Sequence, residues 1–229
     1  MKKCLYLLFV AVVFSLAATA QTAEELVQKA KEKLDKVSDY EASGTMKMNV
    51  VFIKAPIAKV KVFYKKPDKL RIKNESGISL IPKGSVNINL GNVLSNPSDF
   101  NIIDAGKEDK TNLRIIKMLP KDDNANVVLS TLYIDEKTFL VKKSKTTTRE
   151  NGTYELEMTY GKYSDYGLAD KVLFTFNIKD YKLPKGVTFD YDDGTKEDNA
   201  DQVKNKKGKI EIVYSSYSLN KGIPDAVFQ

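Results

Sequence analysis

Twelve residues, KVFYKKPDKLRI from Lys61 to Ile72, decide how this chain is expected to fold. Apolar side chains stand at every second position on both sides of Pro67, and most of the positions between them are lysine or arginine. This period of two is typical of a strand with one buried and one solvated face. Five basic residues in so short a stretch also suggest a patch that binds phosphate. The alternation favours the solvent side of a sheet, with Pro67-Asp68 turning one antiparallel strand into the next.

The same period continues on either side of this stretch. Upstream, even-numbered residues from Ala42 to Phe52 share one face of an expected strand, and Ala58, Val60, Val62 and Tyr64 share one face of the next. Further strands are expected at residues 113–119, 127–134, 140–148, 153–160, 172–178, 186–191 and 209–219. The dipeptide Asn151-Gly152 joins two of them and is a strong hairpin signal. We therefore expect a long meander of antiparallel strands.

Two segments have a helical rather than a strand period. Leu26, Ala30, Leu34 and Val37 recur at helical intervals, and Thr22 precedes Glu25 at the spacing of a capping box, which predicts a helix over residues 23–38. A second, short amphipathic helix is expected around residues 90–94, before Pro97 and Phe100. A sheet of about ten strands with one apolar face must curl or be covered. The expected fold is mainly β, a strongly curved antiparallel half-barrel with an N-terminal helix and short helices covering the concave face.

The first 20 residues have the pattern of a cleaved secretory signal. Lys2 and Lys3 precede an apolar run at residues 5–16, and small residues end the pattern at Ala18-Thr19-Ala20. We expect residues 21–229 to form a single exported domain. No later stretch approaches the roughly 20 apolar residues of a membrane span, so the mature chain is not expected to cross a membrane.

The composition excludes several kinds of active site. The chain has no histidine, and its one cysteine, Cys4, lies in the expected signal. Zinc sites of Cys and His, Ser-His-Asp triads and Cys-His pairs are therefore excluded from the mature chain. The acidic residues between Asp190 and Asp201 lack the spacing of a calcium loop, so we interpret them as a solvated, charged excursion of residues 190–209. We expect a binding protein that is not an enzyme and uses no metal and no cofactor.

The order of several phrases resembles one known family. LDKVSDYEASGTMKM (Leu34 to Met48), KVFYKKPDKLRI, LYIDEKTFLVKKSKT (Leu132 to Thr146) and SLNKGIPDAVF (Ser218 to Phe228) are similar to phrases of the bacterial LolA-type periplasmic lipoprotein carriers and the broader lipoprotein-sorting proteins. The resemblance implies a half-barrel whose apolar interior holds lipoprotein acyl chains in the periplasm. It also implies an inner-membrane extraction complex and an outer-membrane acceptor as partners. In the carriers the residue before the proline is typically an arginine that latches the lid, and here it is Lys66.

The expected site follows from the alternation and the resemblance together. The residues expected to line a lipid-binding cavity are Met46, Met48, Val50, Val60, Val62, Tyr64, Leu70 and Ile72. The residues expected to form a lid are Leu90, Val93, Leu94 and Phe100, with Lys66 as the candidate latch. Ordinary core packing explains the first set equally well, and a fixed packing helix explains the second.

Three functions are compatible with these patterns. The first is a monomeric periplasmic carrier of lipoprotein acyl chains. The second is a periplasmic sensor of lipids or lipoproteins that has the same fold and acts through a partner protein. The third is a structural domain whose side chains fill its interior. The modest net charge of +7 and the expected export argue against nucleic acid as a partner.

Overall fold

The structure is a computed structural model that describes residues 21–50, 53–54, 57–74, 94–150, 152–177 and 207–228. The expected signal, the charged excursion up to residue 206, the strand at 186–191 and most of the expected second helix lie outside these residues. The described part is an antiparallel sheet with one α-helix, α2 (Ala23–Asp35). The expectation of a mainly β fold is confirmed.

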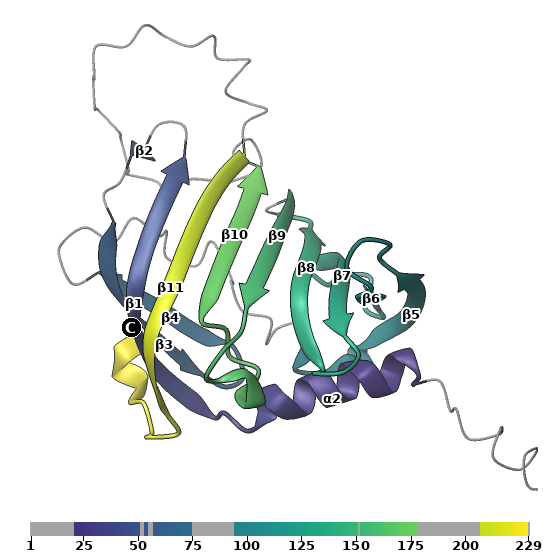
Figure 1. The fold of residues 1–229 in the computed structure, drawn as a ribbon, viewed down its shortest axis with the longest axis horizontal. Coiled ribbons are helices and arrows are strands. Elements are labelled where there is room, and N and C mark those ends of the chain that lie inside the picture. Colours follow the sequence, from purple (N-terminus) through teal and green to yellow (C-terminus); the bar gives the residue numbers. More distant parts are fainter. Residues whose placement is uncertain are drawn as a thin grey trace, which may run out of the picture.

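The strands form two antiparallel meanders, β1 to β4 and β5 to β11, which are joined by the pairing of β1 with β11. They are β1 (Asp39–Val50), β2 (Ile53–Lys54), β3 (Ala58–Lys65), β4 (Lys69–Asn74), β5 (Phe100–Lys107), β6 (Arg114–Pro120), β7 (Val127–Asp135), β8 (Leu140–Thr148), β9 (Gly152–Thr159), β10 (Lys171–Asn177) and β11 (Lys207–Leu219). Their order in the sheet is β4-β3-β1-β11-β10-β9-β8-β7-β6-β5, with β2 paired to β1. In the described sheet β4 and β5 are the two edges and do not pair with each other. The sheet curls without closing into a barrel (Figure 1).

Helix α2 begins where the sequence predicts and for the predicted reason. The Thr22 side chain accepts a hydrogen bond from the Glu25 backbone N–H, and the Glu25 carboxylate accepts one from the Thr22 N–H. These two bonds satisfy donors that the first helical turn leaves unpaired. The buried face of α2, formed by Ala23, Leu26, Val27 and Ala30, joins the main hydrophobic core. The helix therefore crosses one end of the sheet and closes it (Figure 1).

Of the short covering helices that were expected, the described residues contain only the end. Leu94 is a single helical residue, followed by a 3-10 turn at Pro97–Asp99. Phe100 begins strand β5. Within the described part of the chain, α2 is the one α-helix that covers the inner side of the sheet.

The alternation around Pro67 is confirmed. Val60 and Val62 are each 1% exposed, Tyr64 is also buried, and Leu70 and Ile72 pack half-buried against the core. Lys59, on the opposite face, is exposed. Phe63 shares the outer face with Lys61 and Lys65, yet it is buried, and the Lys73 ammonium lies 5.4 Å from its ring centre.

The basic residues of this stretch are held in ion pairs. Lys61 pairs with Glu41 at 2.9 Å, and Lys65 and Lys69 pair with Asp225 at 2.8 and 3.1 Å. The Lys65 Nζ also donates to the Ile223 carbonyl at 3.0 Å. Lys65 and Lys69 thus attach the C-terminal segment to the β3–β4 turn.

Candidate functional site

The inner face of the sheet is mostly apolar. The backbone register places its residues in rows across the strands, one of which consists of Ile116, Leu132, Ser144, Leu156, Phe174, Ile210 and Met48. All seven are buried. A neighbouring row contains Met158, Val172, Ile212, Met46 and Ala58. The inner face therefore presents apolar side chains along much of its width, and in this structure they are covered.

The residues expected to line a cavity lie together on one wall of this face. Met46 and Met48 come from β1, Val60, Val62 and Tyr64 from β3, and Leu70 and Ile72 from β4, and all point inward by register. Val50 ends β1, and its side chain lies outside the described residues. The structure brings the described members together and buries all but Leu70 and Ile72. Residues that line a closed binding cavity and residues of an ordinary core are buried to the same degree, so burial does not distinguish the two.

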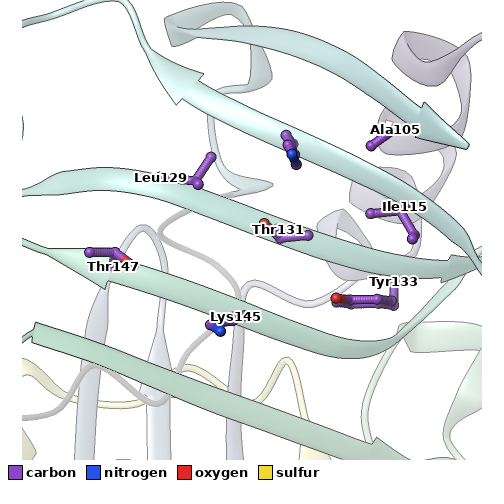
Figure 2. Close-up of a pocket in the computed structure, with 8 residues that line it drawn as sticks. Ala105, Ile115, Leu129, Thr131, Tyr133, Lys145 and Thr147 are labelled. Carbon is purple, nitrogen blue, oxygen red and sulfur yellow. The ribbon is translucent and has the colours of Figure 1, made fainter. Parts of the chain in front are cut away.

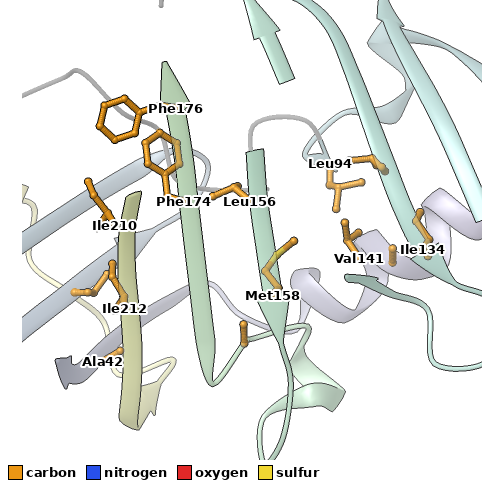
Figure 3. Close-up of a cluster of buried hydrophobic side chains, with 14 of the residues drawn as sticks. Ala42, Leu94, Ile134, Val141, Leu156, Met158, Phe174, Phe176, Ile210 and Ile212 are labelled. Carbon is orange, nitrogen blue, oxygen red and sulfur yellow. The ribbon is translucent and has the colours of Figure 1, made fainter. Parts of the chain in front are cut away.

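Sequence reasoning missed the part of the inner face on β10, which continues this wall beyond β11. Its largest side chains are Phe174 and Phe176 on β10, whose stacked rings lie 5.1 Å apart (Figure 3). Tyr154 lies 5.5 Å from Phe174. Gly208 gives Phe176 its room, because a Cβ at that position would lie 2.4 Å from the Phe176 Cζ. The period of two in residues 172–178 and 209–219 is the sequence feature from which these inward-facing residues could have been predicted.

A tyrosine cluster occupies the inner face where β1, β3 and β11 meet. The Tyr217 ring lies 5.4 Å from Tyr40, 4.9 Å from Tyr163 and 5.1 Å from Tyr214. The Tyr217 hydroxyl donates to the Ala169 carbonyl at 2.6 Å. Burial raises the pKa of Tyr40, Tyr214 and Tyr217 well above the usual value. These phenols therefore stay neutral at physiological pH and present amphipathic rings to the interior.

The described lid candidates lie toward the β5 edge of the inner face, away from the edge formed by β4. Leu94 is 1% exposed and lies close to Ile134 and Val141 (Figure 3). Phe100 packs partly buried against the core from the edge strand β5. Leu90 and Val93 lie outside the described residues. The end of the expected lid segment is thus seated on β7 and β8.

Lys66 holds the end of helix α2. Its Nζ donates to the Asp35 backbone carbonyl and to Asp35 Oδ1, each at 3.0 Å. Asp35 also pairs with Lys31. Burial raises the pKa of Asp35, but the hydrogen bonds from Lys31 and Lys66 outweigh it and keep this pKa below the usual value. A cation at the last helical carbonyls also suits the helix dipole. Lys66 therefore ties the β3–β4 turn to the end of α2.

Replacing Lys66 with methionine should lower the free energy of unfolding by less than about 1 kcal/mol, because both partners are more than a third exposed. The Asp35 contribution is present above the ordinary carboxyl pKa of about 4 and is lost as the pH falls through the lowered folded-state pKa. Urea unfolding of wild type and Lys66→Met at pH 7 and pH 3 measures the loss of stability and its dependence on pH. We expect the difference to shrink at pH 3, and Lys66→Arg to match wild type. An equal loss at both pH values would contradict the ion-pair assignment.

A shallow hollow lies on the opposite, outer face of the sheet. It has a volume of about 410 Å³ and is lined by Ala105, Ile115, Lys117, Leu129, Thr131, Tyr133, Lys145 and Thr147 (Figure 2). The register pairs Ile115 with Tyr133 and Thr131 with Lys145, so these side chains alternate with the buried inner ones. Its two lysines and two threonines make it a poor site for acyl chains.

Neither a membrane-crossing helix nor a metal-binding group is present in the described part of the chain. None of its helices is long and apolar enough to cross a bilayer. None of its His, Cys, Asp and Glu side chains gather in groups of three or more that could hold a metal ion.

Together, an open curved antiparallel sheet, an apolar inner face and a helix across one end define an α+β half-barrel. No protein-family model matches the sequence, and a search of curated proteins found no match. Solved structures do match. A LolA superfamily protein from Nitrosomonas europaea superposes with a TM-score of 0.54 at 11% identity, covering 92% of this chain and 98% of that one.

Two further solved structures have a similar fold. One is a domain from Vibrio parahaemolyticus described as an outer membrane lipoprotein-sorting protein, with a TM-score of 0.52, 12% identity, and coverage of 90% of this chain and 97% of that one. The other is a DUF1329 family protein from Desulfovibrio piger, with a TM-score of 0.52, 12% identity, and coverage of 92% and 98%. The resemblance to the LolA-type proteins is therefore confirmed at the level of the fold.

Proposed function

We propose that this chain is a periplasmic carrier that binds the acyl chains of lipoproteins on its inner face and transfers them toward the outer membrane. The observation that carries the proposal is the largely apolar inner face, which spans the sheet from Ile116 on β6 to Met48 on β1. The half-barrel fold shared with a LolA superfamily protein and a lipoprotein-sorting domain supports it.

Burial of apolar surface is the binding mechanism. Each methylene removed from water contributes about 0.8 kcal/mol, so a pair of long acyl chains can be held without a specific polar contact. Methionines such as Met46, Met48 and Met158 adapt to chains of different shape. Because the inner face is buried in this structure, binding requires the covering segments to move, with the segment that carries Leu94 as the proposed lid. Release follows when an acceptor offers a better apolar site.

Bound lipid is the direct test. Native mass spectrometry of the protein purified from the periplasm should show acyl species, and delipidated protein should take up a fluorescent fatty acid. Deleting the gene should leave lipoproteins in the inner membrane. A protein that binds the fatty acid while deletion leaves sorting intact would instead indicate the lipid sensor. A protein with no retained lipid and no uptake would refute both.

A further inference from the structure

A polar strip interrupts the apolar inner face at β7 and β8. Ser130, Ser144 and Thr146 point inward, and each is no more than 1% exposed. Ser130 Oγ and Thr146 Oγ1 lie 2.9 Å apart and share a hydrogen bond. Ser144 Oγ has no partner: among the described residues it is the one fully buried side-chain oxygen or nitrogen without a hydrogen bond.

The apolar surroundings of Ser144 make its unpaired hydroxyl unfavourable for the stability of the fold. The register places Leu132 on one side of it and Leu156 on the other. A buried hydroxyl without a partner destabilises a protein, whereas an alanine of nearly the same size would not. Packing alone therefore favours alanine here. An unsatisfied buried group of this kind calls for an explanation, and a ligand is one.

The neighbours of the strip also limit what the ligand can be. The residues that pair with Ser130, Ser144 and Thr146 across the sheet are Met118, Leu132, Leu156 and Tyr154, none of which is charged at neutral pH. A carboxylate or phosphate needs a cation or several donors when it is buried. A neutral carbonyl oxygen needs one donor, and a serine hydroxyl supplies one.

We propose that Ser144 donates a hydrogen bond to the ester carbonyl of a glycerol-bound acyl chain, with the Ser130–Thr146 pair beside it as the rest of a polar subsite. The chains then extend over the apolar residues of the same rows, toward Phe174 and Ile210 in one direction and Ile116 in the other. This inference rests on the proposed function and adds the position and chemistry of the ligand's head end. Glycerol esters occur in both lipoproteins and phospholipids.

The test compares ester and ether lipids on the full mature chain. Dipalmitoyl phosphatidylglycerol and its dihexadecyl ether analogue, which lacks both carbonyls, would each displace a fluorescent fatty acid. Wild type should bind the ester about fivefold more tightly, the factor that one hydrogen bond of about 1 kcal/mol corresponds to. Ser144→Ala should bind both lipids equally and keep the wild-type affinity for the ether. Ser216→Ala, which removes an exposed hydroxyl of β11, should keep the preference.

A second readout separates a ligand contact from a packing role. Thermal unfolding of the lipid-free protein should give a Tm for Ser144→Ala equal to or above that of wild type, whereas a serine needed for packing would give a lower one. A diacylglyceryl-cysteine peptide, tested beside the phospholipid, shows which source of the ester binds more tightly. Equal binding of ester and ether by wild type, or a preference that survives in Ser144→Ala, would overturn this inference alone. If no probe or lipid binds, the proposed function fails and this inference fails with it.

Discussion

Replacing Phe174 with alanine is expected to lower the free energy of unfolding by about 3–5 kcal/mol, the range for removing a buried aromatic ring. Phe174 is 2% exposed, lies between Leu156 and Ile210 in its row, and stacks on Phe176. The ring is therefore surrounded by apolar groups on the inner face, and its loss leaves a cavity. Urea unfolding followed by circular dichroism measures the change.

The neighbouring residue provides the matched control. Leu173 is on the same strand but faces outward between Glu157 and Glu211 and is only partly buried, so Leu173→Ala should cost about 1 kcal/mol or less. Similar losses for both variants would show that the inner face is not the main core. An apolar cavity accepts apolar ligands, so Phe174→Ala should also bind a fluorescent fatty acid at least as tightly as wild type. Weaker binding would contradict this expectation, because it would show that the space left by the ring does not accept an acyl chain.

Local patterns in the sequence were sufficient to predict most of the fold. The capping box at Thr22 and Glu25 and the alternation from Ala58 to Tyr64 both involve residues that are close in the chain, and the structure shows both. The hairpin expected at Asn151-Gly152 is present as the pairing of Thr148 with Gly152, where Gly152 has a positive φ of 63°. Such features depend on local geometry and can be read from one sequence.

Features that depend on distant pairs could not be predicted in this way. The partner of Lys66 is Asp35, 31 positions earlier, and no spacing rule identifies it. Strand β5 was obscured because Ile103 and other apolar residues break its alternation; Ile103 faces outward and is 43% exposed. The polar strip was invisible for a similar reason, since Ser130, Ser144 and Thr146 become neighbours only through the β7–β8 pairing. The candidate site is thus defined by the sheet register more than by any motif.

The ending SLNKGIPDAVF, which resembles the lipoprotein-sorting proteins, now has a physical explanation. Asp39 is 6% exposed, and its Oδ1 accepts hydrogen bonds from the backbone N–H groups of Lys221 and Gly222, both at 3.0 Å. Asp225 meets the lysines of the β3–β4 turn. The C-terminal turn therefore fastens the point where α2 passes into β1, which fixes the helix against the end of the half-barrel.

Asn220 is the central residue of this junction, and Asn220→Ala is expected to cost about 2.5–5 kcal/mol. Its Oδ1 accepts from the Ser38 N–H at 2.7 Å and from the Ser38 hydroxyl at 3.0 Å, and its Nδ2 donates to the Lys36 carbonyl at 2.9 Å. Each such bond contributes about 0.5–1.5 kcal/mol. Its φ of 55° lies in the left-handed region, where asparagine is tolerated and alanine adds roughly 1 kcal/mol of strain.

Two further variants at this position separate the two causes. Asn220→Gly removes the side-chain bonds but not the freedom to adopt a positive φ, so it should lose less stability than Asn220→Ala by about 1 kcal/mol. Asn220→Asp keeps the acceptor for Ser38 and loses only the donor to Lys36, so it should be the mildest of the three. Equilibrium unfolding in urea gives this order directly, and a glycine variant as unstable as the alanine variant would show that backbone strain plays no part. Because the junction positions α2, the alanine variant should also exchange the amide protons of residues 26–37 faster than wild type, while those in the centre of β8 stay protected.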